Sequence, residues 1–217
     1  MTIQNLLTKI ISNDHLHARW LNSLSYLEYR GARKILRSQN TENINLNMLQ
    51  HIFEESKHAI FFKKKAVRIG GQSFDNYHQL NTLQFSAVKN YFYCLDQLIH
   101  HYLVEKMINA REAYQLTSWL IEQRALIVYQ IYNQLLIQYH FDFNMQFLLN
   151  EEEQHFKEVS HLNFVNQEIK QDLLNSEAVL FSDFTTKINK QIDAEELSIN
   201  LFRIENESMA SILAIKP

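Results

Sequence analysis

Apolar residues recur every three or four positions along most of this chain, the spacing that places them on one face of an α-helix. They fall at this interval between residues 21 and 35, and Asn13 and Asp14 before them are residues that cap helix N-termini. The second periodic stretch stops at Gly70-Gly71, a pair typical of a helix end. The pattern predicts helices over residues 14–38, 46–69, 77–100, 105–139 and 143–171, followed by one or two amphipathic helices up to residue 217.

The scarcity of turn-forming residues agrees with this pattern. The 217 residues include only three Gly and one Pro, whereas a β-rich or loop-rich fold needs such residues in quantity. We therefore expect an all-α protein, a four-helix bundle in which residues 77–100 form a crossover helix, with additional C-terminal helices. The length fits a single domain over residues 1–217, with a metal-binding bundle at 14–160 and a helical extension at 161–217.

The net charge and the cysteine content limit which partners and which cellular location we expect for the chain. The net charge of -3 gives no reason to expect nucleic acid, and we interpret the basic run over residues 63–68 as solvated side chains at a helix C-terminus. A single cysteine, Cys94, excludes an intramolecular disulfide and a Cys-x-x-Cys metal site. Charged residues in the middle of the apolar helix at 105–139 argue against a membrane span. The first residues lack a secretory signal, so we expect a cytoplasmic protein.

Six residues able to bind metal ions lie on the four predicted core helices, in two matching halves. Each half has a helix with one glutamate followed by a helix with Glu-x-x-His. Residues three apart on a helix project from one face, so each Glu-x-x-His pair can reach a single metal centre. Carboxylate and imidazole ligands without thiolates suit iron and manganese. The predicted ligands are Glu28, Glu55, His58, Glu122, Glu152 and His155.

A competing pair, Glu158-x-x-His161, follows on the same predicted helix, turned away from the face of His155. The interval between lone glutamate and Glu-x-x-His is 27 residues in the first half and 30 in the second, but 36 if Glu158 is used. We therefore prefer Glu152 with His155. Four carboxylates in a bundle core would each cost several kcal/mol without compensation, and two divalent cations would neutralise them.

The surrounding motifs lie within residues 14–160 and are Leu27-Glu28-Tyr29-Arg30-Gly31-Ala32, Glu54-Glu55-Ser56-Lys57-His58-Ala59, Ile121-Glu122-Gln123-Arg124-Ala125 and Glu151-Glu152-Glu153-Gln154-His155-Phe156. In these motifs the chain resembles the ferritin-like di-iron carboxylate superfamily, which includes rubrerythrins, aldehyde-deformylating oxygenases and tRNA hydroxylases. The resemblance implies a ferritin-like bundle holding two iron ions, or iron with manganese. It implies that Glu55 and Glu152 bridge the metals. It also implies that Glu28 and His58 complete the ligands of one metal and that Glu122 and His155 complete those of the other.

Three further residues are candidates for positions around the ligands. Tyr129 lies seven residues after Glu122, although a core tyrosine with a satisfied hydroxyl is the simpler interpretation. His51, four residues before Glu55, either supports the ligands or is an ordinary histidine. Phe62 occupies the offset at which the related ribonucleotide reductase small subunits carry a radical-forming tyrosine, and this argues against such a role.

Two other features near the ligands have alternative readings. Gly31 and Ala32, one turn beyond Glu28, either leave room for O2 or a substrate or let two helices approach closely. Glu151, one turn before His155, is either a spare carboxylate or a solvated neighbour in the acidic run Glu151-Glu152-Glu153, and we favour the latter interpretation.

The resemblance implies an oxidoreductase that activates O2 or peroxide, with a small or apolar organic molecule as substrate. Because the chain has no Cys-x-x-Cys pair for a rubredoxin domain, electrons would come from a separate ferredoxin or reductase. Two alternatives stay open, an iron-binding and peroxide-scavenging ferritin-like protein and a non-catalytic helical bundle. A homodimer is compatible with either.

Overall fold

The computed structural model describes residues 2–38, 42, 44–106 and 109–213, and these residues form helices and connections without a strand. The described helices are α1 (Ile3–Ile11), α2 (Asp14–Ser38), α3 (Leu46–Gly70), α4 (Phe85–Lys106), α5 (Ala110–Gln138), α6 (Gln146–Val159) and α7 (Gln167–Leu213), with short 3-10 turns η1 (Gln72–Phe74) and η2 (Gln79–Asn81). The all-α prediction is confirmed. No helix in this part of the chain is long and apolar enough to cross a membrane.

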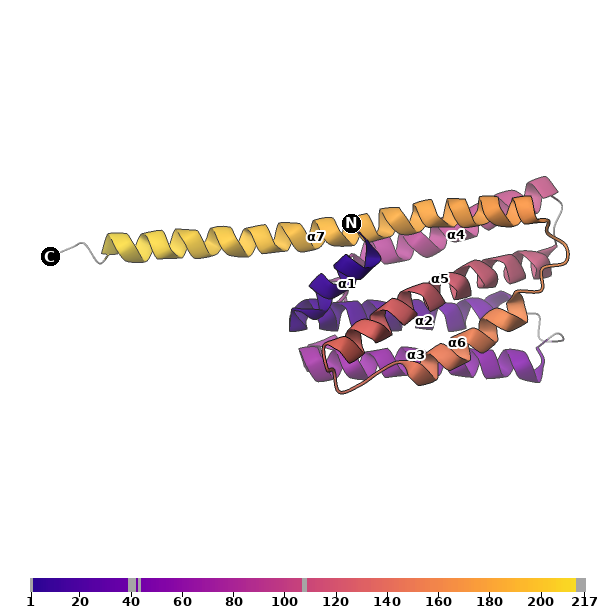
Figure 1. Cartoon of the computed structure of the whole chain (residues 1–217), viewed down its shortest axis with the longest axis horizontal. Helices are drawn as coiled ribbons and strands as arrows, with labels where there is room; N and C mark the ends of the chain where they lie inside the picture. Colours follow the sequence, from indigo (N-terminus) through magenta and orange to yellow (C-terminus); the bar gives the residue numbers. More distant parts are fainter. Residues whose placement is uncertain (1, 39–41, 43, 107–108, 214–217) are drawn as a thin grey trace.

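Two helical hairpins form the bundle (Figure 1). α2 and α3 run alongside each other, as do α5 and α6, and α3 also contacts α6 while α2 contacts α5. α4 crosses over between the hairpins, as the sequence predicts. The end of α3 follows from local chemistry, because Gly71 has φ +87, a value that favours glycine, and its N–H bonds to the carbonyl of Val67 at 2.8 Å.

α4 and the first half of α7 pack together over the bundle. Between them the ring of Tyr91 on α4 stacks on that of Phe184 on α7, with centroids 5.6 Å apart, and both residues are buried. α7 bears the apolar spacing that the sequence predicts for this surface. The far half of α7 extends beyond the bundle in Figure 1. α1 is short and packs against α2, α5 and α7.

Several predicted boundaries are wrong. The helix expected over 143–171 ends at Val159, and residues 167–171 begin α7, which continues as one helix to Leu213. Asn166 explains the break, since its side chain accepts a hydrogen bond from the N–H of Ile169 at 2.9 Å and starts a new helix. The crossover helix begins at Phe85, not residue 77, and α1 was not expected. Residues 214–217 of the expected C-terminal helices lie outside the described part.

The basic run at the end of α3 is only partly solvated. The Lys63 ammonium lies 3.6 Å from the centre of the Tyr77 ring and donates hydrogen bonds to the carbonyls of Phe74 and Asn76 at 3.3 and 3.2 Å. Burial lowers the pKa of Lys63 to about 8. Lys63 therefore helps to fasten the connection between α3 and α4, a role that the dipole argument alone does not give.

Candidate metal centre

The six predicted ligands meet in the core of the bundle, and each is at most 7% exposed. α2 contributes one of them, α3 two, α5 one and α6 two. By helix order they are Glu28, then Glu55 and His58, then Glu122, then Glu152 and His155. The competing residues Glu158 and His161 are exposed. The helical spacing therefore brings together the set that the sequence predicts.

These side chains form two overlapping groups that are able to hold metal ions. Within each group, one ligand atom from every residue lies within 4.8 Å of the others. One group contains Glu28, Glu55, His58 and Glu152; the other contains His51, Glu55, Glu122 and His155. Glu55 belongs to both groups, as a bridging carboxylate would. Glu152 belongs only to the first, and His51 was not expected among the ligands.

In the first group, the imidazole of His58 faces two carboxylates. Its Nδ1 lies 3.0 Å from Oε1 of Glu152 and 3.7 Å from Oε2 of Glu28. Tyr129 of α5 also reaches this group, and its hydroxyl donates a hydrogen bond to Oε1 of Glu28. The tyrosine is thus both a core residue with a satisfied hydroxyl and a direct neighbour of a predicted ligand.

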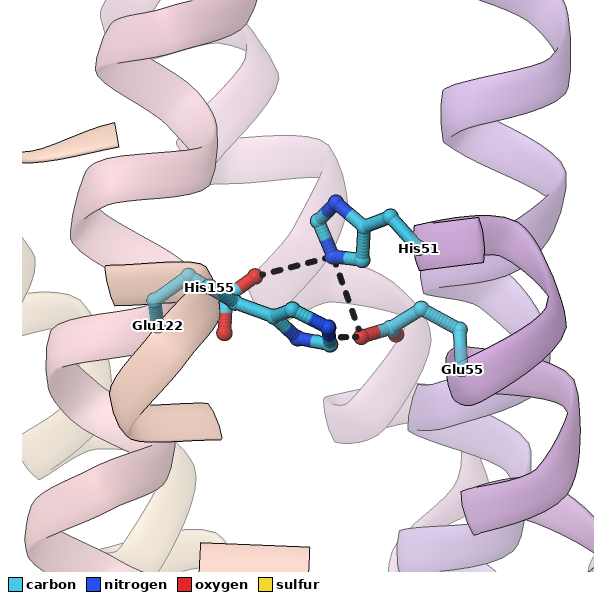
Figure 2. Close-up of side chains that lie close together, drawn as sticks. All are labelled: His51, Glu55, Glu122 and His155. Atoms are coloured by element: carbon cyan, nitrogen blue, oxygen red, sulfur yellow. Dashed lines mark ion pairs between the residues drawn. The ribbon is translucent and has the colours of Figure 1, made fainter. Parts of the chain in front are cut away.

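The second group joins α3, α5 and α6 (Figure 2). Nε2 of His51 lies 3.4 Å from Oε1 of Glu55 and 3.5 Å from Oε1 of Glu122. Nδ1 of His155 lies 3.8 Å from the same oxygen of Glu55. The two imidazole rings are 3.9 Å apart between centroids, so both approach the same pair of carboxylates.

Each predicted histidine ligand is oriented by a glutamate from the opposite hairpin. Nε2 of His58 on α3 bonds to Oε2 of Glu151 on α6 at 2.9 Å, and Nε2 of His155 on α6 bonds to Oε2 of Glu54 on α3 at 2.7 Å. These bonds direct Nδ1 of both rings at the ligand carboxylates, which is how metal-binding histidines are commonly oriented. Glu151 is therefore not merely a solvated neighbour. The sequence signal was available, since a glutamate directly precedes both Glu-x-x-His motifs.

Several buried polar atoms of the cluster lack a hydrogen-bond partner among the described residues. They are Nε2 of His51, Nδ1 of His58, Nδ1 of His155 and Oε1 of Glu152. A buried polar atom left in this condition costs about 1–3 kcal/mol. All four atoms are potential metal donors, and a pair of cations would satisfy them together, so the residues fit a two-metal site.

The electrostatics of the cluster favour bound positive charge. Burial, reinforced by neighbouring carboxylates, raises the pKa of Glu28 to about 8 and that of Glu122 well above its usual range. Burial opposes charge on Glu152 as well, but the adjacent imidazoles of His155 and His58 lower its pKa. Burial alone would lower the pKa of His58 and of His155. Glu152 and other carboxylates outweigh this effect and raise the pKa of His58 to about 11 and that of His155 to about 9. The carboxylates thus attract cations, whether protons or metal ions.

Gly31 allows Glu55 to take its position. A Cβ atom at residue 31 would overlap Oε2 of Glu55, so the missing side chain leaves room for a predicted ligand. Gly31 also lines an apolar cavity beside the carboxylates, so the space left by the missing side chain serves both the position of Glu55 and that cavity. Phe62 is fully buried, with its ring centroid 5.6 Å from that of Tyr129, and it presents no hydroxyl to the cluster.

An apolar cavity of about 80 Å³ adjoins the four carboxylates. Its walls come from α2, α4, α5 and α7 and include Trp20, Leu24, Phe92, Val128 and Phe184. The histidines of the cluster do not line this cavity. The carboxylate side of the centre therefore faces an apolar space, while the imidazoles lie on the side of α3 and α6.

The fold and the site define an all-α protein with a buried cluster of histidines and glutamates that is able to hold metal ions. No protein-family model matches the chain, and no curated protein or solved structure matches it. The function must accordingly be argued from the geometry and chemistry of the site itself.

Proposed function

We propose that this chain is a ferritin-like di-metal carboxylate oxidoreductase, which binds two iron ions, or iron with manganese, and uses O2 or peroxide on a small apolar substrate. The observation that carries the proposal is the pair of overlapping ligand groups sharing Glu55. Two groups with one carboxylate in common are suited to hold two cations close together, and such pairs are typically 3.5–4 Å apart. The four unpartnered donor atoms support the same assignment.

The donor set favours iron or manganese over a structural zinc. It consists of carboxylates and imidazoles without a thiolate, and these ligands suit redox-active divalent ions. Such ions, when bound, supply the electron-transfer chemistry that O2 or peroxide requires. The protein contributes the ligands, holds the imidazoles through Glu54 and Glu151, and excludes bulk water from a buried site.

The apolar cavity supports a substrate of matching character. Its lining is mostly hydrocarbon and aromatic, and its only carboxylates are the predicted metal ligands. A molecule that buries apolar surface there would reach the carboxylate side of the centre without displacing an imidazole. Tyr129 holds a proton on its hydroxyl, bonded to Glu28, at the border between cavity and ligands. Electrons would come from a separate donor, such as a ferredoxin or reductase.

Metal content per chain tests the proposal directly. Freshly purified protein, and apoprotein reconstituted anaerobically with ferrous iron, should contain about two metal ions per chain by elemental analysis. Glu55→Ala should lose both ions together, because this residue belongs to both groups. Glu158→Ala is the matched control, since it removes an exposed glutamate from the same helix as Glu152 and should leave the content unchanged.

Two results would overturn the proposal. Wild-type protein that takes up no stoichiometric metal would leave a non-catalytic bundle, and loss of metal in Glu158→Ala but not in Glu55→Ala would exclude this ligand set. Two bound irons that turn over peroxide, without O2-dependent conversion of any apolar substrate, would instead favour the iron-handling alternative.

A further inference from the structure

His51 lies one turn before Glu55 on α3, and residues 51, 55 and 58 share one face of the helix. The residue is 8% exposed, and its Nε2 is buried without a hydrogen-bond partner among the described residues. The nearest acceptors, Oε1 of Glu55 and Oε1 of Glu122, are 3.4 and 3.5 Å away. Those distances are long for a hydrogen bond to nitrogen. The bundle thus buries a polar atom, directs it at two carboxylates and leaves it without a bond.

The spacing of this group suits a metal ion. Ligand atoms about 2.0–2.2 Å from a common ion lie roughly 3–4 Å from one another, and the nitrogen–oxygen distances from His51 and His155 to Glu55 are 3.4 and 3.8 Å. The second ring nitrogen of His51 points away from the carboxylates in Figure 2. An ion between Glu55 and Glu122 would therefore be approached by a nitrogen from each of the two histidines.

The two halves of the site differ at this position. When the Glu-Glu-x-x-His motifs of α3 and α6 are aligned, the residue corresponding to His51 is Leu148, which is fully buried and apolar. The first group accordingly has one imidazole, from His58, and the second group has two. The two halves of the sequence thus differ at the position where His51 adds a third imidazole to the cluster.

We propose that His51 is a direct ligand of one metal, so that the two metal positions are chemically unequal. The position between His51, His155, Glu55 and Glu122 offers two nitrogens, whereas the position between His58, Glu28, Glu55 and Glu152 offers one. Imidazole favours Fe²⁺ and Co²⁺ over Mn²⁺, which prefers carboxylate oxygen. The nitrogen-rich position therefore discriminates more strongly against manganese. This inference rests on the proposed two-metal function.

Titration of apoprotein with Co²⁺ and, separately, with Mn²⁺ tests the assignment, with calorimetry and the visible spectrum of bound Co²⁺ as readouts. Wild type should bind two equivalents of Co²⁺ in steps of unequal affinity. His51→Leu, which copies the residue of the other half, should weaken one step by about 100-fold or more, since loss of an outer-sphere partner alone costs 10–100-fold. The other step should stay unchanged, and the preference for Co²⁺ over Mn²⁺ should fall only at the weakened position.

Two further variants separate ligation from folding. His51→Ala should regain the weakened step when free imidazole is added, because the vacated space admits a ligand of the same kind. His100→Ala removes an exposed histidine from α4 and should behave like wild type. Equal affinities in His51→Leu and wild type, or equal weakening of both steps, would refute the ligand role while leaving two-metal binding intact. Absence of metal binding in wild type would instead refute the proposed function together with this inference.

Discussion

At the scale of single residues, Gly31 links the backbone of α2 to a predicted ligand of α3. A methyl group there would overlap the end of the Glu55 side chain, which can rotate away at little cost to stability. Alanine is also favoured over glycine within a helix by about 1 kcal/mol. We therefore expect Gly31→Ala to fold at least as stably as wild type and to lose metal affinity by about 10-fold or more, as disturbed ligand positioning does.

Metal titration together with urea denaturation would check this separation of binding from stability. Arg33→Ala is the control on α2, because residue 33 is exposed and its side chain contacts Tyr29, outside both ligand groups. Unchanged metal affinity in Gly31→Ala would contradict this prediction, because it would mean that metal binding does not depend on the position of Glu55 against α2.

The six predicted residues could be expected to cluster, from sequence alone, because each half of the site obeys helical spacing. Glu28, Glu55 and Glu122 required only the order of the helices. The choice of Glu152 over Glu158 required the matching intervals between lone glutamate and Glu-x-x-His in the two halves, because angular separation shows only that one of the two pairs can face the core. The roles of Glu151 and His51 did not follow from helical spacing alone, although a glutamate precedes both Glu-x-x-His motifs. Glu151 bonds to His58 on another helix, and His51 approaches Glu122 on α5 as well as Glu55 on its own helix. The register between two helices depends on side-chain packing that a single periodic pattern does not contain.

At the scale of elements, a buried ion pair joins α5 to α7. The guanidinium of Arg124 donates to both carboxylate oxygens of Glu177, and the Tyr91 hydroxyl donates to Oε1 of Glu177 at 2.6 Å. Glu177 is 2% exposed. Removing one partner of a buried pair leaves an uncompensated charge and typically costs 3–5 kcal/mol. We expect Glu177→Ala to lower the free energy of unfolding by roughly 3 kcal/mol, since Arg124 keeps some access to water.

Equilibrium urea denaturation measures this change. Asp183→Ala on the same helix is the matched control: Asp183 is exposed, its partner Lys187 is partly exposed, and such surface pairs contribute at most about 1 kcal/mol. A loss of stability in Glu177→Ala no larger than in the control would show that this contact does not hold α7 to the bundle.

Helix boundaries were predicted well where the termini carry strong local signals and poorly elsewhere. α2 and α3 match the expectation closely, because α2 begins at Asp14 and α3 ends at Gly70 before the positive φ of Gly71. The start of α4 differs because Asn22 of α2 donates hydrogen bonds to the carbonyls of Asn76 and Asn81, which holds this segment against the bundle, and Gln84 directly before α4 has φ +44. This is a tertiary effect, and periodicity within the segment does not report it.

At the scale of the whole molecule, the helices are arranged around one buried cluster of histidines and glutamates. α4 and α7 cover the side of the centre that lies away from the histidines, and together with α2 and α5 they form the apolar cavity. The sequence predicted the crossover but not the cavity, which depends on how Tyr91, Phe92, Phe181 and Phe184 pack around the carboxylates. The ferritin-like assignment, the homodimer and the cytoplasmic location stay predictions.

The proposed metal pair should also stabilise the whole fold. Glu28, Glu55, Glu122 and Glu152 are all buried, and ions that bind the folded chain but not the unfolded chain add about 2.7 kcal/mol per site at a free concentration of 100 Kd. Removal of metal with a chelator should therefore lower the melting temperature of wild type by several degrees, and restored ferrous iron should reverse the change. In Glu55→Ala, which lacks the shared ligand, the same treatment should have little effect. An equal shift in both proteins would place the stabilising metal elsewhere, because a contribution from this centre has to vanish with the carboxylate that both ligand groups share.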